Sequence, residues 1–331
     1  MLSRAANNLY WMSRHIERAE NAARMLDVTY RMSLLPYRVL ERGQEWADPW
    51  ALPLVITGLA STYYARYPGK LASDNVMRFM LLDATNPSSI YSCIQTARDS
   101  ARSMRGTITD EMYQDLNDFW FKLRSFDNSR IQSGVSEFFD WIKIRSHQFR
   151  GVTFGTMLRD EGYRFIRLGT FMERADNTAR ILDVKYHTLL PSVSDVGGAV
   201  DYYQWSALLR SVSAFDAYRK IYRDAITPMK VAELLILRDD MPRSLHTCMN
   251  EIYEILRVLC DASQREAERL AGELHAMLHY GRTQQIIEFG LHEYLLEFIK
   301  GIGKLTDEIS KDFLVPVYPA HAIRTVAINA E

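Results

Sequence analysis

The feature that most constrains this chain is one stretch that occurs twice. Residues 15–30 (HIERAENAARMLDVTY) return 156 positions later as residues 171–186 (FMERADNTARILDVKY), and ten of the fourteen positions from Glu17 to Tyr30 are identical in the second copy. Similarity at one fixed, long offset is the mark of internal duplication. We therefore expect two related halves, each organised around its own copy of this stretch.

Read as an α-helix, the first copy has one apolar face and one polar face. The apolar side chains follow a 4-3-4-3-4 spacing: Met12, Ile16, Ala19, Ala23, Leu26 and Tyr30. On the polar face the two copies agree at five positions: Glu17/Glu173, Arg18/Arg174, Asn21/Asn177, Arg24/Arg180 and Asp27/Asp183. Water tolerates almost any polar side chain, so this agreement around Val28 and Val184 predicts a covered face. A second pair of segments, 76–93 and 231–248, has drifted much further.

Two explanations fit a covered polar face, and the sequence leaves both open. Glu17, Asn21 and Arg24 lie on one i, i+4, i+7 row, so a buried network of ion pairs would hold them in place. Alternatively, the arginines bind the carboxylate or phosphate of a ligand. We expect six charged residues to be buried where the halves meet: Glu17, Arg18, Arg24, Glu173, Arg174 and Arg180. Loss of the Arg180 side chain would then cost about 3 kcal/mol.

The second copy also carries charges that the first copy lacks. Arg159, Asp160, Glu161, Arg164 and Arg167 precede the second Glu-Arg pair, whereas Arg4 is the one charged residue in the matching part of the first copy. Divergence of this kind is how a duplicated scaffold acquires one specialised site, although a solvated helix face explains the charges equally well. The candidate substrate-binding residues are Glu17, Arg18, Asn21, Arg24, Arg159, Asp160, Glu161, Arg167, Glu173, Arg174, Asn177 and Arg180.

Helical periodicity runs through both halves, and no stretch shows the alternation of a β-strand. Pro36 and Pro191 end the two organising helices, because proline cannot continue a helix. Further helices are expected to start at Pro87 and Pro242, each after a polar cap. A second helix in each half carries matching aromatic residues: Trp50, Tyr63 and Tyr67 in the first, and Trp205, Tyr218 and Tyr222 in the second.

These patterns predict an all-α fold, an internally duplicated helical bundle with pseudo-two-fold symmetry. The first repeat comprises residues 1–155, the second comprises residues 156–313 and shares one core with the first, and residues 314–331 form a C-terminal tail. One helical run across 156–190 is expected to join the repeats without a linker, and residues 191–199 form the clearest loop. The tail is low in charge, which favours docking over disorder.

Composition excludes several classes of protein. The net charge of −1 gives no bulk attraction to nucleic acid or to an anionic membrane. No apolar run approaches the ~20 residues of a membrane span, and no signal peptide is apparent. The three cysteines, Cys93, Cys248 and Cys260, make no disulfide framework. They are typical of a reducing compartment, so we expect a cytoplasmic protein.

The sequence gives no positive indication of a cofactor or a metal. It contains no glycine-rich phosphate loop, no nucleophile elbow and no Cys-x-x-Cys motif. His275 and His279 stand at i, i+4 and could share a metal ion, but no His-Glu-x-x-His motif accompanies them. We therefore expect no cofactor and no metal site.

The two Glu-Arg motifs resemble those of the alpha-E family, a bacterial helical domain named for this motif. The likeness includes MLSR at 1–4, NLYWM at 8–12 and GTMLRDEG at 155–162, and it extends to about Leu314. The resemblance implies an all-helical protein encoded beside circularly permuted ATP-grasp ligases, and often beside transglutaminase-like proteins. The resemblance does not identify which residues, if any, are catalytic.

Two hypotheses of function follow. In the first, the protein is a component of an ATP-grasp-linked system that forms peptide or amide bonds, and its Glu-Arg helices supply a substrate or intermediate site. In the second, it is a non-catalytic helical scaffold that stabilises and positions the ATP-grasp partner. The sequence alone names neither the substrate nor the product.

Overall fold

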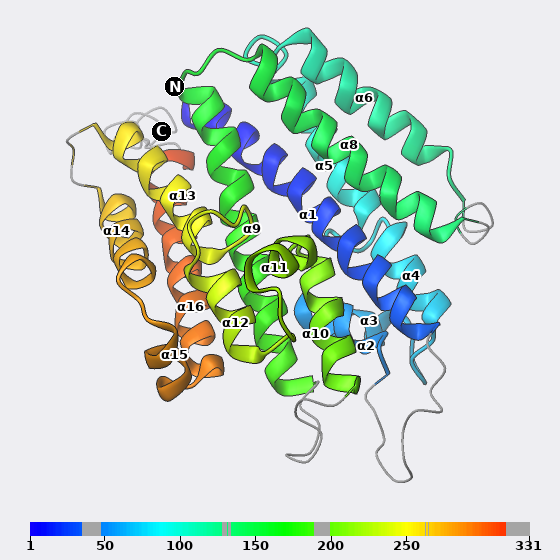
Figure 1. Ribbon diagram of the computed structural model, residues 1–331. Coiled ribbons are helices and arrows are strands. Elements are labelled where there is room, and N and C mark those ends of the chain that lie inside the picture. Colours follow the sequence, from blue (N-terminus) through cyan, green and yellow to red (C-terminus); the bar gives the residue numbers. More distant parts are fainter. Residues whose placement is uncertain are drawn as a thin grey trace, which may run out of the picture.

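The protein is described here by a computed structural model that covers residues 1–34, 48–127, 131, 134–188, 199–261, 263 and 265–315, with side chains from 184 to 201 left out. These residues form helices and no strand (Figure 1). The all-α prediction is therefore confirmed. The predicted loop, apart from Ala199, and the tail beyond Val315 lie outside the described residues.

Two long helices, α1 (Ser3–Ser33) and α9 (Glu161–Thr188), pack against each other through the middle of the molecule (Figure 1). α1 is buried around most of its circumference, and its buried residues include Glu17 and Glu20 as well as the apolar stripe. Helices approach this closely only where the side chains between them are small. At Gly169 there is no room for a side chain, because a Cβ there would lie 2.2 Å from the carbonyl oxygen of Tyr10.

Each central helix has its own set of covering helices. α1 packs against α5 and α8, which α6 covers, and α9 packs against α13 and α16, which α14 covers. The bounds of these six helices are α5 (Ile90–Ser103), α6 (Asp110–Arg124), α8 (Val135–Thr156), α13 (Leu245–Cys260), α14 (Glu266–His279) and α16 (Leu291–Ile309). The polar face of the duplicated stretch is therefore covered, as the sequence predicted.

The aromatic segment predicted as one helix in each half is broken in both halves. In the first half, α2 (Ala51–Ile56) and α3 (Ala60–Arg66) are separated at Gly58, whose φ of +68° a right-handed helix cannot contain. In the second half, α10 (Ala199–Ser211) and α11 (Phe215–Tyr222) are separated at Ser213 with a φ of +55°. No sequence pattern predicts a left-handed serine.

The helix predicted across 156–190 is present from Glu161 to Thr188, but it is not continuous with the helix before it. α8 ends at Thr156, and Met157 is extended with φ −87° and ψ 136°. The carboxylate of Asp160 then accepts a hydrogen bond of 3.1 Å from the backbone N–H of Tyr163, so that Asp160 caps α9. The charge at Asp160 thus has a local structural role.

The helices after Pro87 and Pro242 begin slightly later than predicted. Ser89 and Ser244 are the N-caps, and each side chain accepts from the backbone N–H three residues on. The remaining elements are short: α4 (Ser73–Leu81), α12 (Pro228–Ala232), α15 (Thr283–Phe289) and the π-helical turns η3 (Glu233–Leu237) and η4 (Ser310–Leu314).

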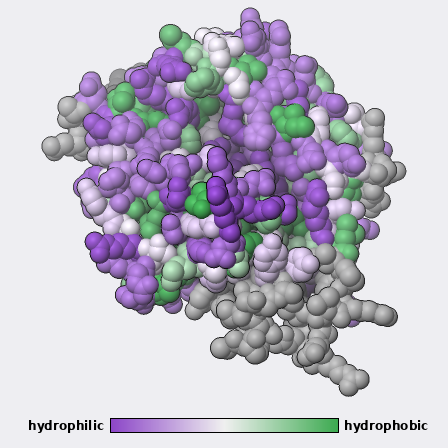
Figure 2. Space-filling model, viewed as in Figure 1, coloured by the Kyte–Doolittle hydropathy of each residue, from purple (hydrophilic) through white to green (hydrophobic). Residues whose placement is uncertain are grey.

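The buried apolar side chains of both halves belong to one continuous core, and the core includes Cys93 and Cys248. The face seen in Figure 2 is mostly hydrophilic, with apolar residues scattered singly among the described ones. None of the described helices combines the length and the apolar composition that crossing a membrane requires.

We predict that Gly169→Ala weakens the contact between α1 and α9. The added Cβ would overlap the Tyr10 carbonyl and the Ser13 hydroxyl, and overpacking of this kind costs about 1–3 kcal/mol. Gly151→Ala is the matched control, since Gly151 lies in α8 with open space around its Cβ position. For Gly151→Ala we expect the free energy of unfolding to rise by roughly 0.5–1 kcal/mol, because alanine favours the helix more than glycine does. Urea unfolding measures both changes, and equal behaviour of the two variants would contradict the close approach.

Candidate functional site

The two Glu-Arg pairs of the duplicated stretch bond to each other across the α1–α9 contact. Glu17 accepts two hydrogen bonds from Arg174, at 3.0 Å from Nε and 3.1 Å from Nη2. Arg18 donates to Glu173 in the same way, at 2.5 Å from Nε and 2.9 Å from Nη2. Planar guanidinium and carboxylate groups favour this two-point geometry. Four of the candidate residues thus form one reciprocal arrangement.

Glu173 is held by a second arginine that the sequence analysis did not select. Arg14 donates from Nε to Glu173 at 2.9 Å and from Nη1 to the Tyr10 hydroxyl at 3.1 Å. Burial alone would raise the pKa of Glu173, but Arg18 and Arg14 outweigh it and lower that pKa to about 2. Glu173 is therefore a carboxylate at any physiological pH.

Glu17 belongs to a larger network with Glu20. Glu17 also accepts from Arg150 at 2.9 Å and forms an ion pair with Arg243 at 2.9 Å. Glu20 accepts from Arg243 at 2.5 Å and from Arg24 at 2.8 Å, and it forms an ion pair with Arg150 at 2.5 Å. The side chains of Glu17 and Glu20 are 1% and 0% exposed, so both carboxylates of this network are inside the protein, while the Arg150 side chain is 25% exposed.

The network contains four guanidinium groups and two carboxylates, and no other described carboxylate bonds to those four arginines. Burial alone would raise the pKa of Glu17 and of Glu20. The surrounding arginines outweigh burial, so both pKa values are lowered. Burial lowers the pKa of Arg243 despite both carboxylates. It also lowers the pKa of His147, which contacts Arg24 and Arg150. With four guanidinium groups and two carboxylates, the network has an excess of two positive charges.

Two central members of the network, Arg150 and Arg243, were missed from the sequence. Arg150 lies on α8, and Arg243 directly precedes the N-cap of α13, so neither belongs to the duplicated stretch. A signal was present, because the matching positions in the other half are Thr306 and Ser88, which carry no charge. This is the same asymmetry that drew attention to Arg159.

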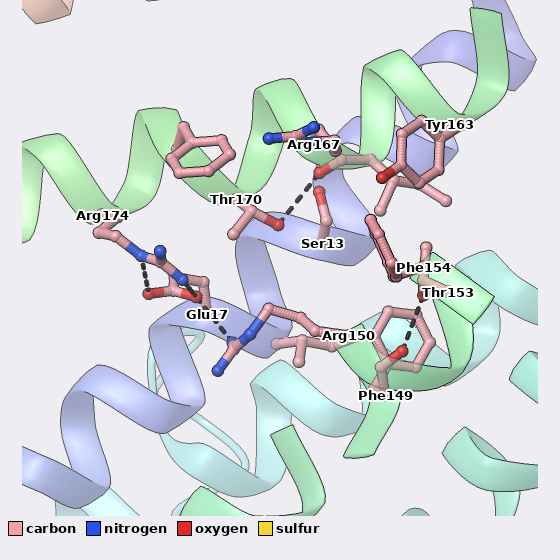
Figure 3. A pocket seen from close by; sticks show the side chains of 13 residues that line it. Ser13, Glu17, Phe149, Arg150, Thr153, Phe154, Tyr163, Arg167, Thr170 and Arg174 are labelled. Atoms are coloured by element: carbon pink, nitrogen blue, oxygen red, sulfur yellow. Dashed lines mark hydrogen bonds and ion pairs between the residues drawn. The ribbon is translucent and has the colours of Figure 1, made fainter. Parts of the chain in front are cut away.

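A cavity of about 260 Å³ opens beside Glu17, between α1, α8 and α9 (Figure 3). The charged groups at the cavity are Glu17, Arg150, Arg167 and Arg174. Its hydroxyls are Ser13, Thr153 and Thr170, and its aromatic walls are Phe149, Phe154, Tyr163 and Phe171. Figure 3 places the ion pairs at one end of this space and the rings of Phe154 and Tyr163 at the other.

A second cavity, of about 250 Å³, lies beside Glu173. Its lining contains five of the candidate residues: Arg18, Asn21, Glu173, Asn177 and Arg180. Arg180 is not buried as predicted. Its side chain is 41% exposed and pairs with Asp176 on the same helix at 2.8 Å, because this part of α9 reaches the surface. Arg24, which shares a helix row with Glu17 and Asn21, forms its ion pair with Glu20.

The charged residues ahead of the second Glu-Arg pair are dispersed. Arg159 is exposed and lies over the Phe154 ring at 5.0 Å, and Glu161 pairs with the amino group of Met1. Arg167 alone among them lines the cavity beside Glu17, and it pairs with Glu251 at 2.5 Å.

Because Arg180 forms an exposed ion pair within its own helix, loss of its side chain should lower the free energy of unfolding by only about 0.3–0.5 kcal/mol, the value of an i, i+4 surface pair.

The fold and the site together define an all-helical protein with buried, reciprocal Glu-Arg pairs between two long helices. Residues 1–314 match the model of Alpha-E, "a predicted alpha-helical domain with a conserved ER motif". The chain belongs to this family.

Curated relatives include an uncharacterised protein of Mycobacterium bovis and one of Mycobacterium tuberculosis. Each is 21% identical to this chain over 336 residues, which cover 90% of the chain. The chain spans about a third of the length of these relatives, 35% in each case. No solved structure matches the chain.

We predict that Glu20→Gln destabilises the protein far more than Asp176→Asn. Glu20 is completely buried and bonds three arginines, so its neutral form would leave buried guanidinium groups unpaired at a cost of about 3–5 kcal/mol. Asp176 occupies the matching position in the second half but is 24% exposed and pairs with Arg180 alone. Its change should cost below about 1 kcal/mol. Unfolding in guanidinium chloride measures the loss of stability in each variant. A similar loss in both would contradict the difference in burial.

We also predict a pH signature for Glu173. Its pKa falls from 4.5 to about 2 on folding, so it stabilises the folded state above pH 4.5 and that contribution fades as the pH falls toward 2. The free energy of unfolding of the wild type should exceed that of Glu173→Gln by about 3 kcal/mol at neutral pH. Urea unfolding at a series of pH values should show this difference shrinking on acidification. A constant difference would mean that the carboxylate charge is not the source.

Proposed function

We propose that this protein is a component of an ATP-grasp-linked system that forms peptide or amide bonds. In this proposal the cavity beside Glu17 binds the substrate or intermediate. The observation that carries the site is the excess of two positive charges in a buried network that borders a cavity. Buried guanidinium groups need a counter-charge, and two carboxylates supply only half of it. An anionic ligand would supply the rest.

The cavity favours a small ligand with an anionic group at one end. Its volume of about 260 Å³ lies below the ~300–1,000 Å³ of sites for drug-sized molecules. Arg167 retains free donors, because its Nε and Nη1 make no hydrogen bond with the described residues. A carboxylate or an acyl phosphate fits such a guanidinium.

The hydroxyls of the cavity favour N–H groups on the ligand. Ser13, Thr153 and Thr170 each donate their hydroxyl hydrogen to a backbone carbonyl of their own helix. Their lone pairs therefore remain available as acceptors. An amino acid or a short peptide offers both an N–H donor and a carboxylate, and its side chain would suit the aromatic wall of Phe149 and Phe154.

The partner in this proposal rests on the family. The resemblance implies that alpha-E proteins are encoded beside circularly permuted ATP-grasp ligases and often beside transglutaminase-like proteins. An ATP-grasp partner would supply the activation of a carboxylate by ATP, for which this chain has no phosphate loop. The relatives that match this chain are themselves uncharacterised, so they add the family and no substrate.

One observation favours the scaffold as a second candidate. Both oxygens of Glu17 and both oxygens of Glu20 are already bonded to arginines, so the two carboxylates are fully paired without a ligand. A helical scaffold that positions the ATP-grasp partner would need only such a rigid interior. The two candidates differ in whether Arg167 matters for product or for assembly.

We further propose that the repeats 1–155 and 156–313 are duplicated copies related by a pseudo-two-fold axis. Three observations support this. The Glu-Arg pairs bond reciprocally, and the same helix packing surrounds α1 and α9. Gly58 and Ser213, which are 155 positions apart, both have positive φ at a helix break. On this proposal the cavities beside Glu17 and Glu173 are equivalent, and the first gained the extra arginines.

We predict that Arg167→Ala abolishes product formation and leaves the protein folded. Arg167 is 34% exposed at the mouth of the cavity, so its loss should change the unfolding free energy by less than about 1 kcal/mol. The measurement is co-expression with the neighbouring ATP-grasp protein, followed by mass spectrometry of amine and carboxylate products. Arg257→Ala is the control, because Arg257 is 53% exposed on α13 and outside the cavity.

The outcomes separate the two candidates. Loss of product with the complex intact supports the substrate site, and loss of the complex supports the scaffold. Full product and full assembly in Arg167→Ala would contradict both roles for this surface.

A further inference from the structure

A cluster of three histidines lies on the far side of α13 from the central helices. His246 is in the first turn of α13, and His275 and His279 stand at i, i+4 on α14. One ring nitrogen of each lies within 4.8 Å of a ring nitrogen of the other two. The ring centroids are 5.4–6.0 Å apart. Three imidazoles from two packed helices therefore face one point.

His246 is oriented as a metal ligand before any metal is present. Its Nδ1 lies 2.7 Å from the carbonyl oxygen of Leu237, and since a carbonyl only accepts, Nδ1 carries the hydrogen. Nε2 therefore presents its lone pair, and it is buried without a hydrogen-bond partner on a residue that is 6% exposed. An unpaired buried acceptor costs stability unless something binds it. Metal-binding histidines commonly hold a backbone carbonyl with the other nitrogen in this way.

The neighbours of His275 fix that ring as well. Its Nε2 lies 2.6 Å from Oδ1 of Asn250, and its ring stacks on Tyr253 with centroids 5.0 Å apart. The ring of His275 is therefore held in place by neighbours on α13. His279 is exposed and leaves the cluster open to solvent.

We propose that His246, His275 and His279 form a binding site for Zn²⁺, with a solvent molecule as the fourth ligand. Three imidazole nitrogens with one open position are a ligand set that Zn²⁺ favours, at about 2.0–2.1 Å from each nitrogen. Tetrahedral coordination brings ligand nitrogens to roughly 3.4 Å from one another. The three ligand nitrogens now lie within 4.8 Å of one another, and metal binding would draw them together by small rotations of the three side chains. The bound ion would tie the start of α13 to the end of α14.

A purely structural cluster of rings is the competing explanation. Stacking accounts for Tyr253 and for the contact of Tyr280 with His279. It does not account for the buried, unpaired Nε2 of His246, because a packed ring without a ligand function gains nothing from a polar atom in that position. Carboxylates that would indicate Ca²⁺ or Mg²⁺ are absent from the described cluster, and imidazole nitrogens favour Zn²⁺ or its neighbours in the transition series.

The test uses the full chain without a histidine tag. Co²⁺ added to the metal-free protein should produce the visible absorption of cobalt bound in a low-symmetry nitrogen site, and Zn²⁺ should displace it. Zn²⁺ should also raise the melting temperature, because an ion that binds only the folded state stabilises it by mass action. His279→Ala is the main variant, since its side chain is exposed and its removal leaves the fold intact. His292→Ala is the control, as His292 lies on α16 and bonds Asp183.

We expect His279→Ala to bind Co²⁺ at least about tenfold more weakly and to lose the Zn²⁺-dependent rise in melting temperature. His292→Ala should behave as wild type. Absence of cobalt absorption in the wild-type protein would overturn the proposal. Equal cobalt binding by wild type and His279→Ala would overturn it as well. Circular dichroism of both variants establishes that they are folded.

Discussion

The fold depends on the reciprocal ion pairs between α1 and α9. Each Glu-Arg pair supplies a carboxylate to the opposite helix and takes a guanidinium from it, so that Glu17 with Arg174 and Glu173 with Arg18 form a reciprocal contact. The desolvation of these groups is costly, and only good geometry with full pairing offsets it. A shift of one helix by a single residue would strand all four charges. The pairs therefore fix the register of the two central helices. The apolar contacts between α1 and α9 are less directional and would not fix it.

Close packing and ion pairing depend on each other along this contact. Gly169 lets α9 touch the backbone of α1 at Tyr10, and the bonded pairs follow one to two turns further along both helices. Without the close approach, the short carboxylate of Glu17 could not reach a guanidinium on α9. The cavity beside Glu17 lies in the same region and extends toward α8. The position of the cavity is thus set by the helix crossing, while the network beside it gains positive charge from Arg150 and Arg243, which lie outside the duplicated stretch.

The sequence predicted the helical class and the covered polar face because both leave periodic signals. Agreement between the copies at Glu17 and Glu173 could be read directly, and the family resemblance pointed to the same residues. Breaks in the chain could not be predicted in this way. Ser213 adopts a positive φ, and Asp160 turns the chain between α8 and α9, through local geometry that no periodicity records. The partners of Glu20 were missed for another reason, since Arg150 and Arg243 come from elements that meet α1 only in the folded protein.

The histidine cluster extends the same lesson to metal sites. His275 and His279 are four residues apart and gave a weak signal, because two imidazoles on one helix face are common without a metal. The third nitrogen comes from His246, about thirty residues earlier and on another helix, and no spacing motif links it to the pair. Its significance rests on a property that only the fold reveals, namely a buried Nε2 with no partner. Arg243 and His246 flank the cap of α13 at Ser244, the former directed to α1 and the latter to α14. One short turn, capped by Ser244, therefore places Arg243 in the Glu17–Glu20 network and His246 in the proposed metal site.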